Sequence, residues 1–408
     1  MANTLNLGNG NWATKEDSLL AYNSENGNFK PLPFDFTRAS SATVVNKAGL
    51  IETVGSGEPR IDFKDDANGA LLLEPTRSNK VYTSNDFNGS GWSLSNLTAT
   101  SNQVISPDGT LNASKLEMTG AGTLRNQSEA SFNDGYAYSI FIKKGNSRYV
   151  TIRSAFFTQS IVVGFDLDTL TAQTNGKIED YGNDWYRLSI TKDISGDADK
   201  SGFFYLYLPN SLGSQTSVSG NYNYFYGGQI EDGSGSYATS YIPNFGNSAG
   251  ATVSADVCNN GANEQVINST EGVLYAEISG FENDTSFRTI SLSDGSNINE
   301  VQLLYSGNTN IIRVILTSNA VTQVDFNYTM TNGVNYNKIA FTYKQNNFQL
   351  WVNGIKRQSD TIGNTSNNLN KIRFQNGVGS ANFYGNVKDI KLYNTALTDS
   401  ELTALTKI

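Results

Sequence analysis

The sequence predicts an all-β chain with two β-sandwich (jelly-roll) domains after an irregular N-terminal β module. Charged residues make up only 16% of the 408 residues, against a usual share of about 25%, and Asn, Ser, Thr and Gly replace them. The 21 Tyr, 21 Phe and 4 Trp are too many for a disordered chain. Short alternating runs bounded by Gly, Asn and Asp recur after residue 80, which is typical of strands.

The first 80 residues form the least regular part. Strand-like runs at 34–45, 50–54 and 70–73 are separated by turns. They hold too little apolar material for an independent core. We therefore expect a small module over 1–80 that attaches to other proteins or helps the chain to oligomerise, steadied by neighbouring chains or by a docking partner.

Residues 81–257 carry about eight alternating runs, spaced roughly 10–15 residues apart. The runs at 136–142, 161–167 and 203–208 place aliphatic or aromatic residues at every second position, which puts them on one face of a strand. This spacing predicts one β-sandwich, most naturally a jelly roll.

Residues 258–408 repeat the pattern and predict a second sandwich, with strands such as 272–278 and 347–352. Asn353-Gly354 follows the second of these runs and favours a type I′ hairpin turn. Thr398-Asp-Ser-Glu401 has the form of a capping box, so a short terminal helix should follow it.

The composition excludes several kinds of chemistry. The chain has no His, so a Ser-His-Asp or Cys-His nucleophile and an imidazole zinc site are excluded. Cys258 is the single cysteine and can form neither an intrachain disulfide nor a cysteine cluster. The net charge of −9 argues against nucleic acid and acidic membranes as partners, and no apolar run approaches the roughly 20 residues of a membrane span.

Paired carboxylates are the catalytic device that remains, and a glycosidase needs only two. Three pairs occur: Asp166 with Asp168, Asp197 with Asp199, and Glu231 with Asp232. Asp also favours turns and strand ends for structural reasons, so we assign no catalytic residue. Acidic loops could supply oxygen ligands to Ca²⁺, but no spacing resembles an EF-hand. Calcium stays an alternative, and we assign no metal ligand.

Aromatic side chains are the better candidates for function. Sugar rings pack their C–H faces on aromatic rings, while nearby polar groups bind the hydroxyls. The run 221–226 alternates polar and aromatic residues. We expect Trp92, Tyr222 and Tyr224 to bind a neutral glycan. Trp185 and Trp351 are better explained as core residues.

Four blocks between residues 34 and 79 form a recognisable pattern. They comprise Arg38 with Ser40, Ser41, Ala42 and Thr43; Gly49, Leu50 and Ile51; Pro59, Arg60, Ile61 and Asp62; and Leu72, Leu73, Glu74, Arg77 and Asn79. This pattern resembles the N-terminal module of structural appendage proteins of tailed bacteriophages. The resemblance implies a virion protein and leaves open whether it sits on the head or the tail.

The two predicted sandwiches carry resemblances of their own. Residues 141–145, 185–187, 228–231 and 236–243 are similar to a carbohydrate-binding-module-like sandwich. Residues 338–343, 350–354, 383–393 and 396–402 resemble the last strands and final helix of laminin-G/concanavalin-A-like lectin domains. These resemblances imply glycan binding, and no rim residue matches a known ligand motif.

Together these observations predict a non-enzymatic bacteriophage appendage, a head or tail fibre or spike, that binds polysaccharide on the host surface. Weak single sugar sites gain from several copies, so we expect a homo-oligomer, most naturally a homotrimer, alongside other virion structural proteins. Residues 1–10 lack the blocks of a secretory signal, so we expect assembly in the host cytoplasm and a final place in the virion. Two alternatives stay open: a structural capsid decoration or connector protein, and a glycan depolymerase.

Overall fold

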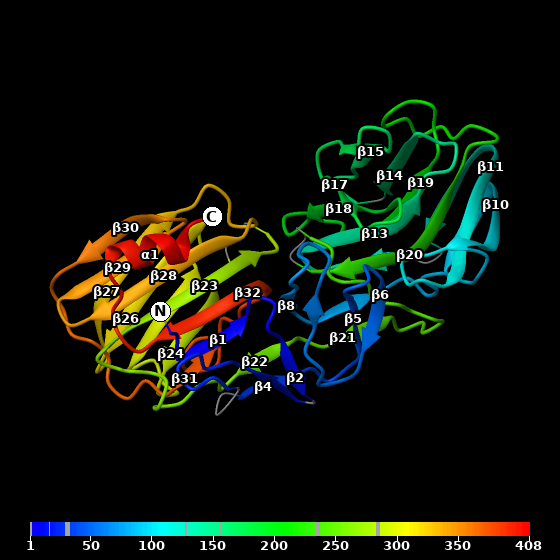
Figure 1. The fold of residues 1–408 in the computed structure, drawn as a ribbon. Coiled ribbons are helices and arrows are strands. Elements are labelled where there is room, and N and C mark those ends of the chain that lie inside the picture. Colours follow the sequence, from blue (N-terminus) through cyan, green and yellow to red (C-terminus); the bar gives the residue numbers. More distant parts are fainter. Residues whose placement is uncertain are drawn as a thin grey trace. The chain divides into compact units, whose positions relative to one another are not determined.

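The computed structural model describes residues 2–15, 17–28, 33–126, 129–155, 157–233, 237–282 and 286–408 (Figure 1). Ser236, at the start of one block quoted above, lies outside this set. The chain forms two compact units. Unit 1 comprises Met1–Ser41, Val54–Pro75 and Ala255–Ile408, and unit 2 comprises Ala42–Thr53 and Thr76–Ser254.

Unit 1 contains most of the C-terminal strands and several from the first 80 residues. Its elements are β1 (Leu5–Gly8), β2 (Ala13–Lys15), β3 (Ser18–Leu20), β4 (Pro33–Thr37), β7 (Ile61–Asp62), β8 (Ala70–Leu73), β22 (Val257–Asn259), β23 (Glu271–Gly280), β24 (Arg288–Ser293), β25 (Glu300–Tyr305), β26 (Ile311–Ser318), β27 (Val321–Thr329), β28 (Asn337–Lys344), β29 (Asn347–Val352), β30 (Ile355–Asp360), β31 (Lys371–Arg373), β32 (Gly385–Tyr393) and α1 (Asp399–Thr406).

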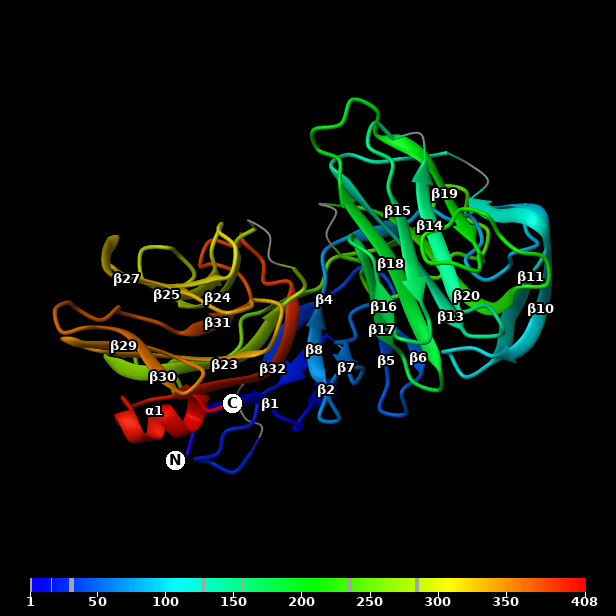
Figure 2. The ribbon, with the colours of Figure 1, turned by 90° about the horizontal axis from the view of Figure 1, so that it is seen from above.

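Two sheets of unit 1 form a sandwich, which Figure 2 shows as two layers with α1 on the outside. One sheet has the order β30-β29-β28-β23-β32-β8-β7, with β1 also paired to β32, and the other has the order β27-β26-β25-β24-β31. Alternate residues of both sheets enter one core, for example Ile278, Phe341 and Val314. This arrangement confirms the predicted sandwich in the C-terminal part.

The first 80 residues do not form a unit of their own. β1 pairs with β32, β8 pairs with β32, and β4 pairs with β22. Leu5, Leu7, Phe34 and Leu71 are fully buried in the core of unit 1. The segment contributes its apolar residues to a core within the same chain, which is a different source of support from the neighbouring chains or partner that we expected.

Residues of the recognised N-terminal pattern form a buried ionic network in unit 1. Arg38 Nη1 lies 3.1 Å from Asp256 Oδ1, and Arg60 Nη1 lies 2.7 Å from Glu74 Oε2. Arg60 also pairs with Asp256, which accepts a 2.8 Å hydrogen bond from the Glu74 backbone N–H. Buried charges need such partners, so the pattern residues Arg38, Arg60 and Glu74 tie separate chain segments together.

Both local turn and cap predictions are confirmed. Asn353 and Gly354 have φ of 51° and 80° between the paired residues Val352 and Ile355, as a type I′ turn requires. α1 begins after Thr398, which forms both hydrogen bonds of a capping box with Glu401.

Unit 2 contains the remaining strands. These are β5 (Ala42–Val45), β6 (Ile51–Val54), β9 (Arg77–Asn79), β10 (Trp92–Ile105), β11 (Leu111–Asn126), β12 (Ala130–Ser131), β13 (Gly135–Lys143), β14 (Tyr149–Ala155), β15 (Val162–Asp166), β16 (Thr171–Ala172), β17 (Gly176–Asp180), β18 (Trp185–Asp193), β19 (Ser201–Tyr207), β20 (Tyr222–Asp232) and β21 (Ala251–Val253).

The long strand β11 divides this unit into two layers. Its first part pairs with β20 and leads through β13 to β18 and β17, whereas its last part pairs with β19 and leads to β14, β15 and β16. We call these layer A and layer B. Both layers bury alternate side chains in one core, among them Ile140 and Phe225 from layer A and Ile152 and Phe204 from layer B. Unit 2 is therefore a second sandwich, as predicted.

A smaller apolar cluster covers part of the outer face of layer A. Val45 and Ile51, from the β5–β6 hairpin, pack with Phe141, Trp185 and Tyr226. The hairpin thus covers the middle of this face. The neighbouring residues of β11 and β20, among them Lys115, Tyr222 and Tyr224, stay partly exposed to solvent.

Candidate functional site

Two tyrosines of β20 mark the partly open part of layer A. Tyr222 and Tyr224 are half-buried and separated by one residue, so both project from the same face of the strand. Their ring centroids are 5.8 Å apart, with the ring planes at 80°. The structure therefore brings together two of the three residues that the sequence predicted for glycan binding.

Charged groups of β11 lie directly beside these rings. Lys115 is paired opposite Tyr224, and Glu117 opposite Tyr222. Lys115 Nζ lies 4.1 Å from the Tyr222 ring centroid and 2.6 Å from Glu117 Oε2. The hydrogen bond to Glu117 raises the pKa of Lys115. This surface thus presents ring faces, hydrogen-bond donors and acceptors within a short distance of one another.

The loop after β13 fixes the position of Tyr222. The Tyr222 backbone N–H donates a 2.8 Å hydrogen bond to Asn146 Oδ1, and the Gly145 N–H donates a 2.7 Å bond to Asn223 Oδ1. A Cβ placed on Gly145 would lie 2.5 Å from the Tyr222 ring. Glycine therefore lets the ring rest on the loop backbone, which holds it in place before any ligand arrives.

The third predicted residue, Trp92, lies elsewhere and is a core residue. It is 5% exposed, and its ring centroid is 5.2 Å from that of Phe87. Its indole Nε1 donates a 2.8 Å hydrogen bond to the Thr83 carbonyl. Trp92 offers no open ring face, so the prediction that it binds a glycan is corrected. Trp185 and Trp351 are buried as predicted.

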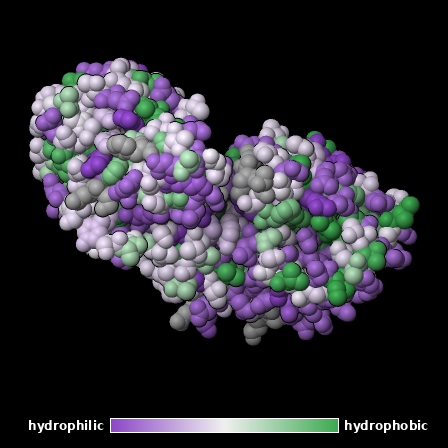
Figure 3. Space-filling view, turned by 180° about the vertical axis from the view of Figure 1, so that it is seen from behind, coloured by the Kyte–Doolittle hydropathy of each residue, from purple (hydrophilic) through white to green (hydrophobic). Residues whose placement is uncertain are grey.

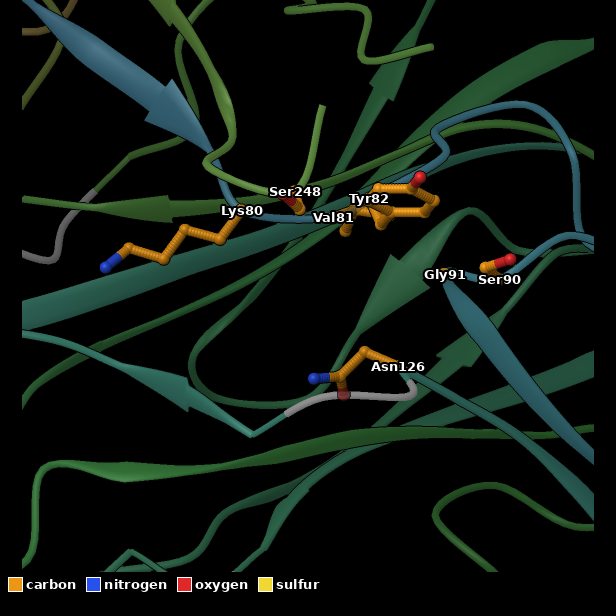
Figure 4. A pocket seen from close by; sticks show the side chains of 7 residues that line it. All are labelled: Lys80, Val81, Tyr82, Ser90, Gly91, Asn126 and Ser248. Atoms are coloured by element: carbon orange, nitrogen blue, oxygen red, sulfur yellow. The ribbon is translucent and has the colours of Figure 1, made fainter. Parts of the chain in front are cut away.

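Unit 2 also contains a hollow of about 370 Å³ that the sequence did not indicate (Figure 4). Its lining consists of Lys80, Val81, Tyr82, Ser90, Gly91, Asn126 and Ser248. The Lys80 ammonium lies 3.6 Å from Asp232 and over the Phe132 ring. The volume is at the lower end of the roughly 300–1,000 Å³ of ligand pockets, so the hollow is large enough for a small molecule.

Two of the three acidic pairs considered for catalysis, Asp166 with Asp168 and Glu231 with Asp232, have structural partners. Arg148 donates to both oxygens of Asp166 at 2.9 and 2.7 Å, and this hydrogen bonding lowers the pKa of Asp166. Asp166 also accepts the Asp168 N–H. Burial raises the pKa of Glu231, whose carboxylate accepts a 3.1 Å bond from the Thr239 N–H. These contacts hold turns and strand ends together.

Sequence reasoning missed a second aromatic face, on β19 in layer B. Phe203, Tyr205 and Tyr207 occupy alternate positions and share one side of the strand. The Tyr205 and Tyr207 ring centroids are 6.4 Å apart, with the planes at 19°. The alternation of aromatic residues in 203–208 could have indicated this face. The partners from neighbouring strands depend on the pairing register, which no local pattern gives.

Two further properties concern metals and membranes. Within the described ranges, no group of three or more Cys, Asp or Glu side chains is placed to hold a metal ion. Among the helices of the part that the structure describes, none is long and apolar enough to cross a membrane.

Comparison with known families supports the lectin-like character of the C-terminal part. Residues 232–403 match the laminin G family model of the concanavalin A-like lectin/glucanases superfamily. The match covers less than half of the chain and includes most of the predicted domain 258–408. The predicted lectin-like domain in this part of the chain is therefore supported. No curated protein matches the sequence.

Similar solved structures come from several sources. The carbohydrate-binding module of the Ruminococcus gnavus IT-sialidase, bound to α2,3 sialyllactose, is 15% identical, with a TM-score of 0.32 over 37% of this chain and 94% of that one. Domain 4 of a Geobacillus stearothermophilus extracellular arabinanase, in complex with arabinotriose, is 14% identical, with a TM-score of 0.31 over 38% and 73%. The botulinum neurotoxin serotype G binding domain is 17% identical, with a TM-score of 0.28 over 37% and 39%.

Proposed function

We propose that this protein is a non-enzymatic glycan-binding protein and that Tyr222 and Tyr224 receive a neutral sugar. The observation that carries the proposal is the pair of half-buried rings, 5.8 Å apart and nearly perpendicular, beside Lys115 and Glu117. The lectin family match over 232–403 supports the same class of function.

The arrangement suits a sugar for a physical reason. A pyranose ring has an apolar C–H face that packs on an aromatic ring, and its hydroxyls need donors and acceptors at the edge. The two perpendicular rings line adjoining sides of one space, and a bound sugar would displace the Lys115 ammonium that lies over the Tyr222 ring. Lys115 can donate to a hydroxyl and Glu117 can accept from one.

The test is a glycan array followed by calorimetry on the full chain. We expect Tyr222→Ala to weaken binding of the best neutral glycan at least tenfold, about 1.4 kcal/mol, and Tyr224→Leu to weaken it less while keeping its packing. Both variants should keep the thermal midpoint of the parent. Tyr82→Ala, in the hollow of unit 2, is the matched control and should bind normally.

Each other outcome has a clear meaning. Lost binding in Tyr82→Ala alone would move the site to the hollow. A parent protein that binds no glycan would contradict the proposal and favour the structural alternative. Release of reducing ends from host capsule would contradict the non-enzymatic part.

We further propose that the protein is a bacteriophage virion appendage, assembled in the host cytoplasm and present as a homotrimer. The resemblance of residues 34–79 to appendage modules supports the virion role, and the benefit of several weak sites supports the oligomer. The burial of Leu5, Leu7 and Leu71 within the chain removes one of the two original reasons for a trimer. Antibody labelling of intact particles tests the location, and light scattering on the purified chain tests the oligomer.

A further inference from the structure

We propose that a second surface of unit 2, the row Arg125–Tyr205–Arg153 on the outer face of layer B, binds a carboxylate-bearing sugar such as a uronic acid. This inference rests on the proposed glycan-binding function and adds a distinct subsite with its own chemistry. The row is set by strand pairing. Arg125 of β11 and Arg153 of β14 both lie directly opposite Tyr205 of β19, one on each side.

The aromatic rings of β19 support both arginines. Arg125 Cζ lies 4.3 Å from the Phe203 ring centroid and 5.9 Å from that of Tyr205. Arg153, which comes from β14 on the other side of β19, has its Cζ 5.9 Å from the centroid of the same Tyr205 ring. It also interacts with the Tyr207 hydroxyl. Contacts of this kind orient guanidinium groups without neutralising their charge.

Among the residues that the structure describes, neither guanidinium of the row has an acidic partner. Within the described residues, no carboxylate lies within 4 Å of Arg125 or Arg153, although Arg148 and Arg313 each hold one. Glu129, the next acidic residue after Arg125, accepts a 2.9 Å hydrogen bond from the Ser201 hydroxyl. Two half-buried arginines with no carboxylate partner among the described residues thus share one row in a chain with a net charge of −9.

One end of the row is closed by a neighbouring segment. Thr151 and Tyr207 pair with each other one step further along the same face, and both are buried. Gly164 of β15 lies on the same row, and a Cβ added to it would collide with the Gly213 backbone. The loop around Gly213 therefore rests on β15. It forms a wall at the Tyr207 end, while Tyr205, Arg125 and Arg153 stay half-exposed.

This combination selects a sugar acid over a simple anion. A guanidinium binds a carboxylate through two parallel hydrogen bonds, and the Tyr205 ring between the arginines can receive the C–H face of the same pyranose. A neutral sugar has no carboxylate to pair with the guanidinium groups, and inorganic sulfate has no C–H face to pack on the Tyr205 ring. Galacturonate or glucuronate uses both.

The experiment is calorimetric titration of the full chain with D-galacturonate and D-glucuronate, with D-galactose, D-glucose and sodium sulfate as comparison ligands. We expect uronate binding that weakens as salt rises, binding of neutral sugars that does not depend on Arg125 or Arg153, and weaker sulfate binding. Arg125→Gln and Arg153→Gln should each weaken uronate binding at least tenfold. Arg357→Gln removes an arginine that lies 4.5 Å over Tyr328 in unit 1 and should leave uronate binding unchanged.

The outcomes separate this proposal from the previous one. Uronate binding that is absent, insensitive to both substitutions, or matched by sulfate overturns the acidic-sugar site, whatever happens at Tyr222. Tyr222→Ala should leave uronate binding intact. If Tyr222→Ala abolishes it, both ligands share the first site and the second site does not exist. Thermal midpoints of the variants within about 2 °C of the parent exclude unfolding as the cause.

Discussion

Asp389 is a buried carboxylate on β32 with an incomplete set of partners. It is 3% exposed and forms an ion pair with Lys391, while its Oδ1 has no hydrogen-bond partner among the described residues. Burial raises the pKa of Asp389 to about 6, against the opposing effect of Lys391, and Glu277 raises it further. A carboxylate in this position has a direct effect on the pH dependence of stability.

The sign of that effect follows from proton binding. Between about pH 4 and pH 6 the folded protein keeps a proton on Asp389 that the unfolded chain has released, so this contribution to stability falls as pH rises. Asp389→Asn carries no such proton. Its free energy of unfolding, relative to the parent, should therefore rise by roughly 2 kcal/mol from pH 4 to pH 7, measured by urea titration.

A control with the opposite sign exists in the same unit. The hydrogen bond from Arg313 lowers the pKa of Asp325, so Asp325→Asn should lose stability relative to the parent as pH rises toward about 4 and should change little above about pH 5. A relative stability of Asp389→Asn that stays constant or falls over this range would show that Asp389 is charged in the folded protein well below pH 6.

Among the elements, the β29–β30 hairpin shows how local chemistry defines a turn. Gly354 has φ of 80°, a conformation that costs an L side chain roughly 1–2 kcal/mol. There is room for a side chain, since the nearest atom to an added Cβ is Lys407 Cα at 3.6 Å. Any loss on substitution therefore comes from the backbone conformation.

Gly354→Ala should lower the free energy of unfolding of unit 1 by about 1 kcal/mol, measured by thermal or urea unfolding. Gly354→Asn should cost less, because Asn tolerates this conformation. Equal losses for the two variants would mean that crowding around the side chain, and not the backbone angle, sets the cost.

The elements also show what the sequence could and could not predict. The turn at Asn353-Gly354, the cap at Thr398 and the Tyr222–Tyr224 pair depend on neighbours in the chain, and local patterns predicted them. The burial of Trp92 and the row Arg125–Tyr205–Arg153 depend on which strands pair and in which register. Residues distant in the sequence decide these features, so no local pattern could reveal them.

At the scale of the whole molecule, each unit is built from separate stretches of chain. β1 and β8 complete the sheet that contains β23 and β32, and four of their leucines, Leu5, Leu7, Leu71 and Leu73, are almost fully buried. Each buried leucine contributes about 2 kcal/mol, and a domain is typically stable by only about 5–15 kcal/mol. The C-terminal strands therefore depend on the N-terminal ones.

A fragment of residues 258–408 should consequently fail to form a cooperative fold, even though it contains most of the residues that match the lectin family. We expect poor amide dispersion by NMR and no sharp thermal transition, in contrast to the full chain. A well-dispersed spectrum from the fragment would show that β1 and β8 are dispensable.

The surface view in Figure 3 shows hydrophobic residues scattered among polar ones on the face it presents. This pattern matches a chain whose apolar residues are used in its two cores and whose exposed face is rich in amide and hydroxyl groups. The binding surfaces proposed here therefore rely on a few placed rings and charges, and not on a broad apolar patch.

The division of the chain also bears on its resistance to proteases. The backbone passes from one unit to the other four times, after residues 41, 53, 75 and 254. If a protease severed any one of these links, three would still join the units, and the cut ends would stay anchored in folded sheets. A molecule with this connectivity can be nicked once and keep both halves attached to one another.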